Sequence, residues 1–244
     1  MTARRSRLRQ RGWRQPTLPQ PRSSHWAKPD KGGSSMTMAV TRRLFWLLGA
    51  VALASTGMPA VAQDAAGQTA PVVALDDGLI AVMKAGTATP FEQRMQMFIA
   101  VVQRAFDLPG VVQATVGLRF ANFSPEQQQQ LIQAFTRFTA ASYVANFDSF
   151  NGQRFEISPA VRRVGNDHVV STQFIDSGGT TRFDYVVRDT GAGYKIVDVL
   201  LDGSISRVAV QRSDFRSALS NNDPSGLIAM LQNKTATLAA GSKG

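Results

Sequence analysis

The stretch GYKIVDVLLDGSISRVAVQRSDFRSAL, residues 193–219, contains the change of period that decides the fold. Residues 194–201 are rich in Ile, Val and Leu, which is typical of a strand with at least one buried face. Asp202 and Gly203 then supply turn chemistry. Beyond them, apolar side chains recur at helical spacing, at Ile205, Val208, Phe215 and Leu219. A strand and a helix therefore border one apolar space, which is filled either by side chains or by a ligand.

Upstream of this stretch, alternating apolar and polar residues predict more strands. Short Gly-containing connections separate them, so the expected arrangement is an antiparallel meander. On the third strand, Phe183, Tyr185 and Val187 share one face, opposite Arg182, Asp184 and Arg188. One face of the sheet should therefore be covered and the other wet. The four predicted strands are residues 154–164, 167–176, 180–188 and 193–201.

Helical periods flank the predicted sheet on both sides. Capping-box patterns at Thr89 and Ser124 predict helix starts, and the second of these helices should run to about Asn146. The other predicted helices are residues 71–85, a short one after 107–110, 205–219 and one after Asp223-Pro224. The predicted fold class is α+β: N-terminal helices, a four-stranded antiparallel curved sheet, and C-terminal helices that pack to enclose an apolar cavity.

The formal charge of +10 first suggests a nucleic-acid binder, but it is unevenly placed. Eleven Lys and Arg and one acidic residue precede Gln63, whereas 16 of each follow from Gln63 onward. A neutral mature domain lacks the charge on which phosphate-backbone affinity depends, so no nucleic-acid partner is expected.

The N-terminal residues have the order of a secretory signal. Arg42 and Arg43 precede the apolar run of residues 44–54, and small residues follow up to Ala62. This run is too short for a comfortable membrane span, so we expect cleavage after Ala62 and an exported mature protein; an uncleaved anchor is the alternative. The expected organisation is a basic extension plus signal peptide over residues 1–62 and a single domain, with residues 63–70 as a flexible leader, over 63–244.

Groups for catalysis are scarce in the predicted mature domain. It has one histidine, His168, no cysteine and no clustered metal ligands, so no cofactor or metal is predicted. Asp198 lies inside an apolar strand, where alternation places it beside Ile196; it could form a salt bridge with an arginine of a neighbouring strand, or act as a base of raised pKa. A small α+β enzyme with Asp198 and His168 as an acid–base pair is therefore the alternative function. Arg212 could pair with Asp198, pair in the neighbourhood of Asp214, or meet an anionic head group at a cavity mouth.

Several segments resemble the MlaC and toluene-tolerance family of periplasmic phospholipid-binding proteins. They are FDLPGVVQATVGLRF (106–120), SPEQQQQLIQAFTRFTAASYVANF (124–147), YKIVDVLLDGSIS (194–206) and RSDF (212–215). The segment LLDGSISRVAVQRSDF is most similar to the hopanoid-associated HpnM branch. Arg212, Ser213 and Phe215 match the family pattern residue by residue, whereas Phe120 and Tyr194 replace tryptophans that the family often has.

The resemblance implies a carrier rather than an enzyme. Such a carrier takes the acyl chains of a phospholipid, or of a hopanoid-type lipid, into an apolar cavity and shuttles the lipid between an inner-membrane ABC transporter complex and an outer-membrane lipoprotein complex. We expect apolar residues on the converging helices and the covering sheet to line the cavity, with one arginine at its edge. The candidate lipid-binding residues are Phe98, Val102, Phe106, Phe135, Phe138, Tyr185, Val187, Val197, Val199, Val208, Arg212 and Phe215.

Overall fold

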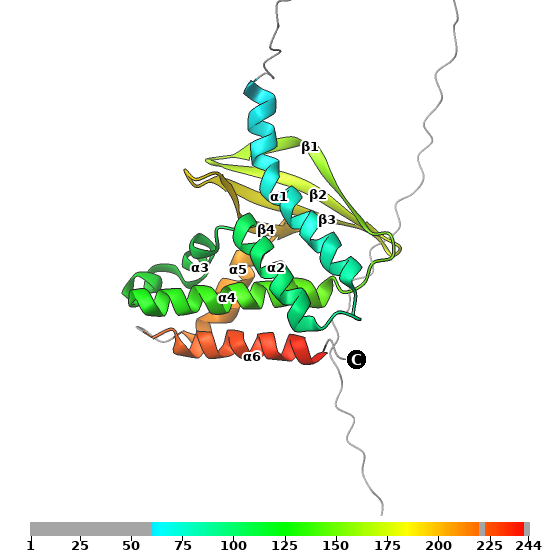
Figure 1. Ribbon diagram of the computed structural model, residues 1–244. Coiled ribbons are helices and arrows are strands. Elements are labelled where there is room, and N and C mark those ends of the chain that lie inside the picture. The colour runs from blue at the N-terminus through cyan, green and yellow to red at the C-terminus, as the bar shows by residue number, and fades with distance from the viewer. Residues whose placement is uncertain (1–59, 220–222, 242–244) are drawn as a thin grey trace, which may run out of the picture. The chain divides into compact units, whose positions relative to one another are not determined.

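The computed structural model describes residues 60–219 and 223–241. The basic extension and the apolar run of the predicted signal peptide lie outside these residues. The described chain is α+β, with helices gathered against an antiparallel sheet (Figure 1). The helices are α1 Ala60–Ala85, α2 Phe91–Ala105, α3 Leu108–Val116, α4 Pro125–Asn146, α5 Arg207–Phe215 and α6 Ser225–Gly241, with 3-10 turns η1 Gly117–Asn122 and η2 Arg216–Ala218. None of the described helices is long and apolar enough to cross a membrane.

The sheet is a meander in the order β1-β2-β3-β4-β5, with every neighbouring pair antiparallel. Its strands are β1 Arg154–Val164, β2 Asp167–Asp176, β3 Gly179–Asp189, β4 Tyr194–Leu201 and β5 Ile205–Ser206. The four predicted strands are therefore confirmed, β1 and β2 at the predicted bounds. The prediction of four strands missed the two-residue β5.

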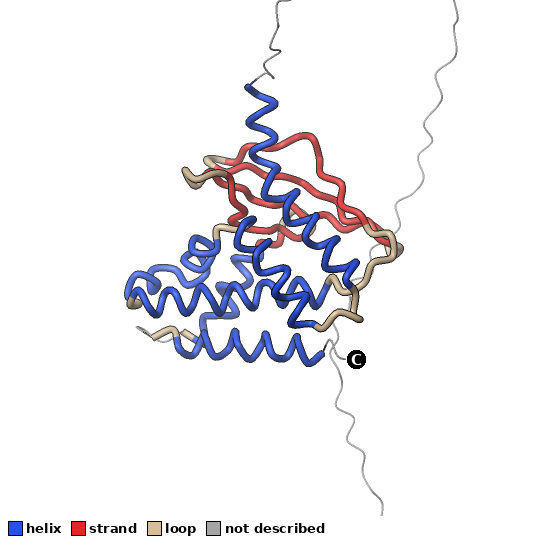
Figure 2. Tube along the Cα trace, viewed as in Figure 1, coloured by secondary structure: helices blue, strands red, loops and turns tan. Residues whose placement is uncertain are grey.

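Helix α1 is longer than its apolar period predicts. It begins at Ala60, so the expected flexible leader over residues 63–70 is wrong, and the helix runs through the predicted cleavage point after Ala62. Helix α1 lies along the sheet, as Figures 1 and 2 show, and also packs against α2. Gly78 allows that close packing, because a Cβ atom there would lie 2.7 Å from Cγ1 of Val101.

The two predicted capping boxes have different outcomes. At α4, Ser124 Oγ accepts the Gln127 N–H at 3.2 Å, and Gln127 Oε1 accepts the Ser124 N–H at 2.9 Å, which confirms the prediction. At α2 the prediction is wrong, because Thr89 Oγ1 donates back to the carbonyl of Ala85 in α1 and Pro90 takes the N-cap position. Thr89 therefore caps the end of one helix instead of the start of the next.

The core lies between the covered face of the sheet and the helices. Tyr185, Val187 and Ile196 are at most 2% exposed and belong to one apolar cluster with residues from α1 to α6. On the opposite face, the predicted wet surface has an exception. Asp184 is fully buried there and is held by Arg182, whose Nε and Nη2 atoms donate to the two carboxylate oxygens at 2.8 and 2.7 Å.

Strand β4 carries a bulge that strict alternation did not predict. Ile196 pairs with Val187 and Asp198 pairs with Val186, so Val197 is the extra residue. Ile196 and Val199 consequently share the covered face, although they are three residues apart. The predicted placement of Asp198 on the same face as Ile196 is wrong for this reason.

The Asp202-Gly203 turn closes a hairpin instead of leading directly into a helix. Both residues have positive φ, 50° and 73°, which is the requirement of a type I′ hairpin turn. Ile205 pairs with Leu201 in β5, and the helix starts only at Arg207. The predicted helical role of Ile205 is therefore wrong. Helix α6 continues through the small and polar residues after Thr235 to Gly241, beside α4.

Candidate functional site

A small apolar cavity lies where four parts of the fold meet. Its walls come from the α2–α3 junction, from α4, from β4 and from α5. Its volume is about 30 Å³, which is roughly the share of one water molecule in the liquid. The predicted cavity between sheet and helices therefore exists, but in this structure side chains almost fill it. The lining residues are Phe106, Leu108, Val111, Phe135, Thr139, Tyr143, Val197, Asp198, Val199, Arg207, Val208 and Gln211.

Helix α4 presents one face to this cavity. Phe135, Thr139 and Tyr143 are spaced four residues apart, so they lie above one another on the helix. Thr136 and Ser142 donate their hydroxyl groups to carbonyls one turn back, at 2.7 and 2.8 Å. Thr139 does not, and its buried Oγ1 has no hydrogen-bond partner among the described residues. The apolar wall thus carries a hydroxyl group that is available to a ligand.

Asp198 is a structural cap and not a free base. Its Oδ1 accepts the N–H groups of Val199 at 2.7 Å and of Val208 at 3.1 Å, and its Oδ2 accepts the hydroxyl of Ser206. Val208 is in the first turn of α5, whose unpaired N–H groups and positive dipole end favour a carboxylate. The expected salt bridge is wrong, because no ion pair in the described part of the chain involves Asp198.

The proposed acid–base pair is also wrong, for geometric reasons. His168 pairs with Val187 and Asp198 pairs with Val186, so the two residues are in adjacent rows and their side chains leave opposite faces of the sheet. Strand β3 separates them, which places their backbones about 10 Å apart. His168 packs edge-on against Tyr194, with ring centroids 5.7 Å apart. These two groups cannot share a substrate.

Arg212 connects two helices. Its Nε and Nη2 atoms donate to the carbonyl oxygen of Ala114 at 3.0 and 2.7 Å. Ala114 lies in the last turn of α3, where carbonyls lack helical donors and a cation is favourable. Arg212 is exposed and is outside the cavity lining. In this structure it therefore joins α5 to α3, and it pairs with neither Asp198 nor Asp214.

The predicted lipid-binding residues divide into three groups by position. Five of them line the cavity: Phe106, Phe135, Val197, Val199 and Val208. Five others are buried in the surrounding core: Phe98, Val102, Tyr185, Val187 and Phe215. Of the remaining two, Phe138 lines an open groove between α4 and α6, and Arg212 joins α5 to α3. Contact of any of these residues with lipid stays a prediction.

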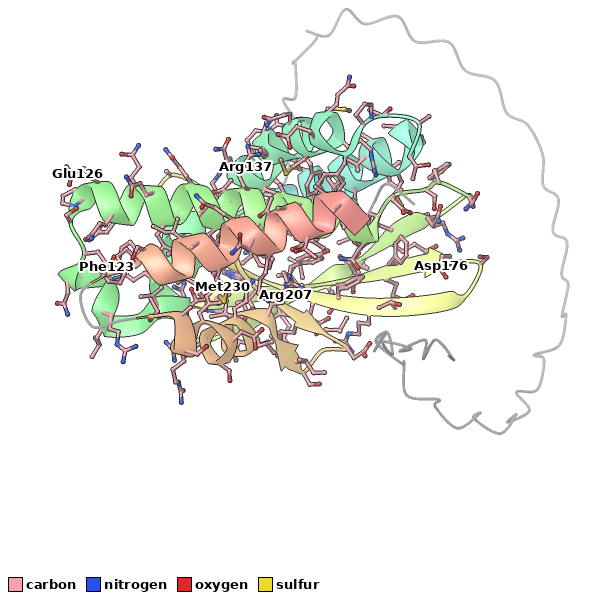
Figure 3. The ribbon with its side chains drawn as sticks, turned by 90° about the horizontal axis from the view of Figure 1, so that it is seen from below. Phe123, Glu126, Arg137, Asp176, Arg207 and Met230 are labelled. Atoms are coloured by element: carbon pink, nitrogen blue, oxygen red, sulfur yellow. The ribbon has the colours of Figure 1, made fainter. Side chains whose placement is uncertain are left out.

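Arg207 is a cavity residue that the sequence analysis missed. It is the first residue of α5, it is exposed, and it makes no hydrogen bond or ion pair within the described residues. Figure 3 labels it at the start of α5, near the sheet. Its position shortly after the Asp202-Gly203 hairpin was the signal in the sequence. The apolar period places the helix start at residue 205, two residues before the observed start, and therefore hides the role of Arg207. Arg207 is a cation available at the edge of an apolar cavity.

A second missed residue is Asp76, which lies within the buried stripe of α1. It is 5% exposed, and neither of its carboxylate oxygens has a partner among the described residues. Burial raises the pKa of Asp76 to about 8, and the neighbouring charge of Asp77 adds to the increase. Its signal in the sequence was an acid four residues after Val72 and three before Leu79, on the predicted apolar face.

Tyr143 lines the cavity and packs on Phe98, which lies against α1 at Gly78. Burial raises the pKa of its hydroxyl to about 12; the charge of Arg207 lowers it, and that of Asp76 raises it further. Burial also raises the pKa of Tyr185, and the charges of Tyr143 and Asp76 contribute. The charges of Arg207 and Asp76 therefore act in opposite directions on the pKa of Tyr143.

These features define the class: an α+β protein with an apolar cavity between its helices and a curved antiparallel sheet, and a free cation at the cavity edge. The protein-family model described as MlaC protein matches residues 74–233, well over half of the chain. The chain belongs to the MlaC family. The HpnM-like branch stays a prediction.

One solved structure extends this comparison. It is a phospholipid-binding protein from Ralstonia solanacearum, solved at 1.53 Å in complex with a phospholipid. It is 21% identical to this chain, with a TM-score of 0.61, and the match covers 70% of this chain and 98% of the other. At this identity the similarity establishes the fold. A comparison with curated proteins gave no significant match.

Proposed function

We propose that this protein is a periplasmic lipid carrier that holds the acyl chains of a phospholipid in the cavity between α4, α5 and β4. The observation that carries the proposal is the apolar cavity with Arg207 free at its edge. Family membership and the phospholipid-bound structure of similar fold support it. A hopanoid-type lipid is an alternative cargo for the same cavity.

Such a carrier must shield the whole acyl chain of its lipid from water. Exposure of an acyl chain to water costs about 0.8 kcal/mol per CH₂ group, or on the order of 12 kcal/mol for 16 carbons. A cavity of about 30 Å³ cannot hold such a chain, so the walls must separate when lipid enters. Helix α5 is the wall with the fewest anchors, because two of its nine residues are buried. We therefore assign the opening to α5, with Phe106, Phe135 and Val208 displaced by the chain.

The phosphate of the lipid would then lie at Arg207, and its tails in the apolar part.

We further propose that the carrier passes lipid between an inner-membrane transporter complex and an outer-membrane lipoprotein complex, after export and cleavage behind Ala62. An envelope-purified protein whose first residue is Gln63 is the expected result of N-terminal sequencing. An intact residue 1–62 segment would contradict the cleavage.

Uptake from vesicles tests the proposal. The purified protein is incubated with vesicles of dioleoyl phosphatidylglycerol and dioleoyl phosphatidylethanolamine, separated from them, and measured by native mass spectrometry. We expect a mass increase of one phospholipid per chain. A protein that remains lipid-free after incubation would contradict the proposed function.

A further inference from the structure

We infer that Asp76, a buried and unpartnered acid on α1, is a polar subsite that hydrogen-bonds an oxygen atom in the buried part of the lipid. The inference rests on the proposed lipid-carrying function and adds the chemistry by which the protein selects its lipid. The class of ligand is a lipid whose buried part carries a hydrogen-bonding oxygen, either an ester carbonyl or a hydroxyl group.

The first argument is the free-energy penalty that the buried Asp76 imposes on the fold. Burial of a polar group without a hydrogen bond is unfavourable, and a leucine at the same position of the apolar stripe would avoid the penalty. Val72, Leu75 and Leu79 surround position 76 on the buried face of α1 and are at most 1% exposed. Packing therefore gives no reason for an acid at this position, whereas a ligand would.

The second argument is the chemical state of the group. An isolated buried carboxyl group is neutral at pH 7, because burial disfavours its charged form. A neutral carboxyl group has one O–H donor and retains an acceptor oxygen. It can therefore donate to an ester carbonyl, or exchange hydrogen bonds with a hydroxyl group.

The third argument is continuity with the cavity. Tyr143 lines the cavity and its ring lies 5.5 Å from that of Phe98, which in turn lies against α1 at Gly78, two residues from Asp76. No hydrogen bond from the Tyr143 hydroxyl occurs among the described residues, and the unpartnered Thr139 Oγ1 lies one turn away on the same helix.

Matched lipids test the inference. Wild-type protein, Asp76→Leu and the control Asp77→Leu, which changes the exposed neighbour, are each incubated with three phosphatidylglycerol vesicles: dioleoyl diester, dioleyl diether, and a diether with a hydroxyl group at the chain ends. We expect Asp76→Leu to lower the uptake of one oxygen-bearing lipid by about tenfold, as for one lost hydrogen bond. Uptake of the plain diether should not change.

The pattern of loss identifies the source of the oxygen. A selective loss for the diester indicates the ester carbonyl, and a selective loss for the hydroxylated diether indicates a hydroxyl group. Equal uptake of all three lipids by Asp76→Leu and wild-type protein would overturn the inference while the proposed function stands. A wild-type protein that takes up no lipid would remove both.

A measurement on unaltered protein guards against a variant that fails to fold. At pH 9 the carboxyl group has lost its proton, so it can no longer donate to an ester carbonyl. With the ester carbonyl as partner, the wild-type preference for the diester over the plain diether should therefore fall from pH 7 to pH 9. A diester preference that is the same at both pH values, or the absence at pH 7 of a preference for either oxygen-bearing lipid, would overturn the inference.

Discussion

Oδ1 of Asp198 accepts the backbone N–H of Val208 at 3.1 Å, so a carboxylate on β4 fixes the start of α5. The same carboxylate also accepts the hydroxyl of Ser206, the N-cap residue of that helix. Because both Asp198 and Val208 line the cavity, this bond sets the position of one cavity wall relative to another.

Replacement of Asp198 by alanine should loosen that wall. The loss of the cap is expected to lower the free energy of unfolding by about 1–2 kcal/mol. Chemical denaturation of the variant measures the change. Asp214→Ala, at an exposed position on the same helix, is the control and should stay within about 0.5 kcal/mol of wild type. Equal stabilities of the two variants would show that the cap does not hold α5.

The buried carboxylate of Asp184 depends on Arg182. Removal of the arginine leaves a charge without its two donors, so Arg182→Met should lower the free energy of unfolding by about 2 kcal/mol or more. Arg154→Met removes a pair with Glu156 in which both side chains are more than half exposed, and it should cost under about 0.5 kcal/mol. Urea denaturation distinguishes the two variants, and similar costs would contradict this account.

The pH dependence of stability should contain a contribution from Asp76. Its pKa is about 8 in the folded protein against the ordinary value of 3.8, so between these values the folded state holds a proton that the unfolded chain has lost. As far as Asp76 is concerned, the free energy of unfolding is highest below about pH 4 and falls as the pH rises to 8, by about 1.4 kcal/mol per pH unit. Asp76→Asn lacks this titration.

Denaturation of the wild-type protein and of Asp76→Asn at several values between pH 5 and pH 8 gives the two slopes. The wild-type stability should fall relative to that of the variant as the pH rises. Parallel stability profiles would mean that Asp76 ionises normally.

Arg207 should contribute to the recognition of an anionic head group. Arg207→Gln is expected to lower the uptake of phosphatidylglycerol from vesicles by about threefold to tenfold, the effect of one charge-assisted hydrogen bond at an exposed site. Arg216→Gln removes an exposed arginine that is not in the cavity lining and should have no effect. Equal uptake by the two variants would place the head group elsewhere.

The strands and α4 could be predicted closely because their signals are local. Alternation and short Gly-containing turns determine β1 to β4, and Ser124 with Gln127 forms the predicted cap of α4. Thr89 shows where local signals fail. Because α1 and α2 are joined by a tight turn, its hydroxyl group donates to the end of α1 instead of capping the start of α2. The bulge at Val197 depends on how β4 pairs with β3, which the sequence of one strand does not reveal.

The site was predicted less completely than the fold. Large apolar residues were expected to line the cavity, and Phe106, Phe135 and Val208 do so. The same residue type fills the core, so Phe98 and Val187 could not be distinguished from them by period alone. Arg207 and Asp76 were missed because their roles depend on tertiary contacts, namely the late start of α5 and the packing of α1 against the sheet.

Blocking the cavity tests the central claim most directly. Val208→Trp places a large ring where the acyl chain must enter, whereas Val210→Trp adds the same ring to an exposed position on the same helix, 45% accessible and outside the cavity lining. Both variants are incubated with dioleoyl phosphatidylglycerol vesicles, and native mass spectrometry measures the fraction of lipid-bound chains. The account predicts that Val208→Trp loses most of the bound lipid while Val210→Trp binds as the wild type does. Full lipid occupancy of Val208→Trp would contradict the claim that this cavity holds the lipid.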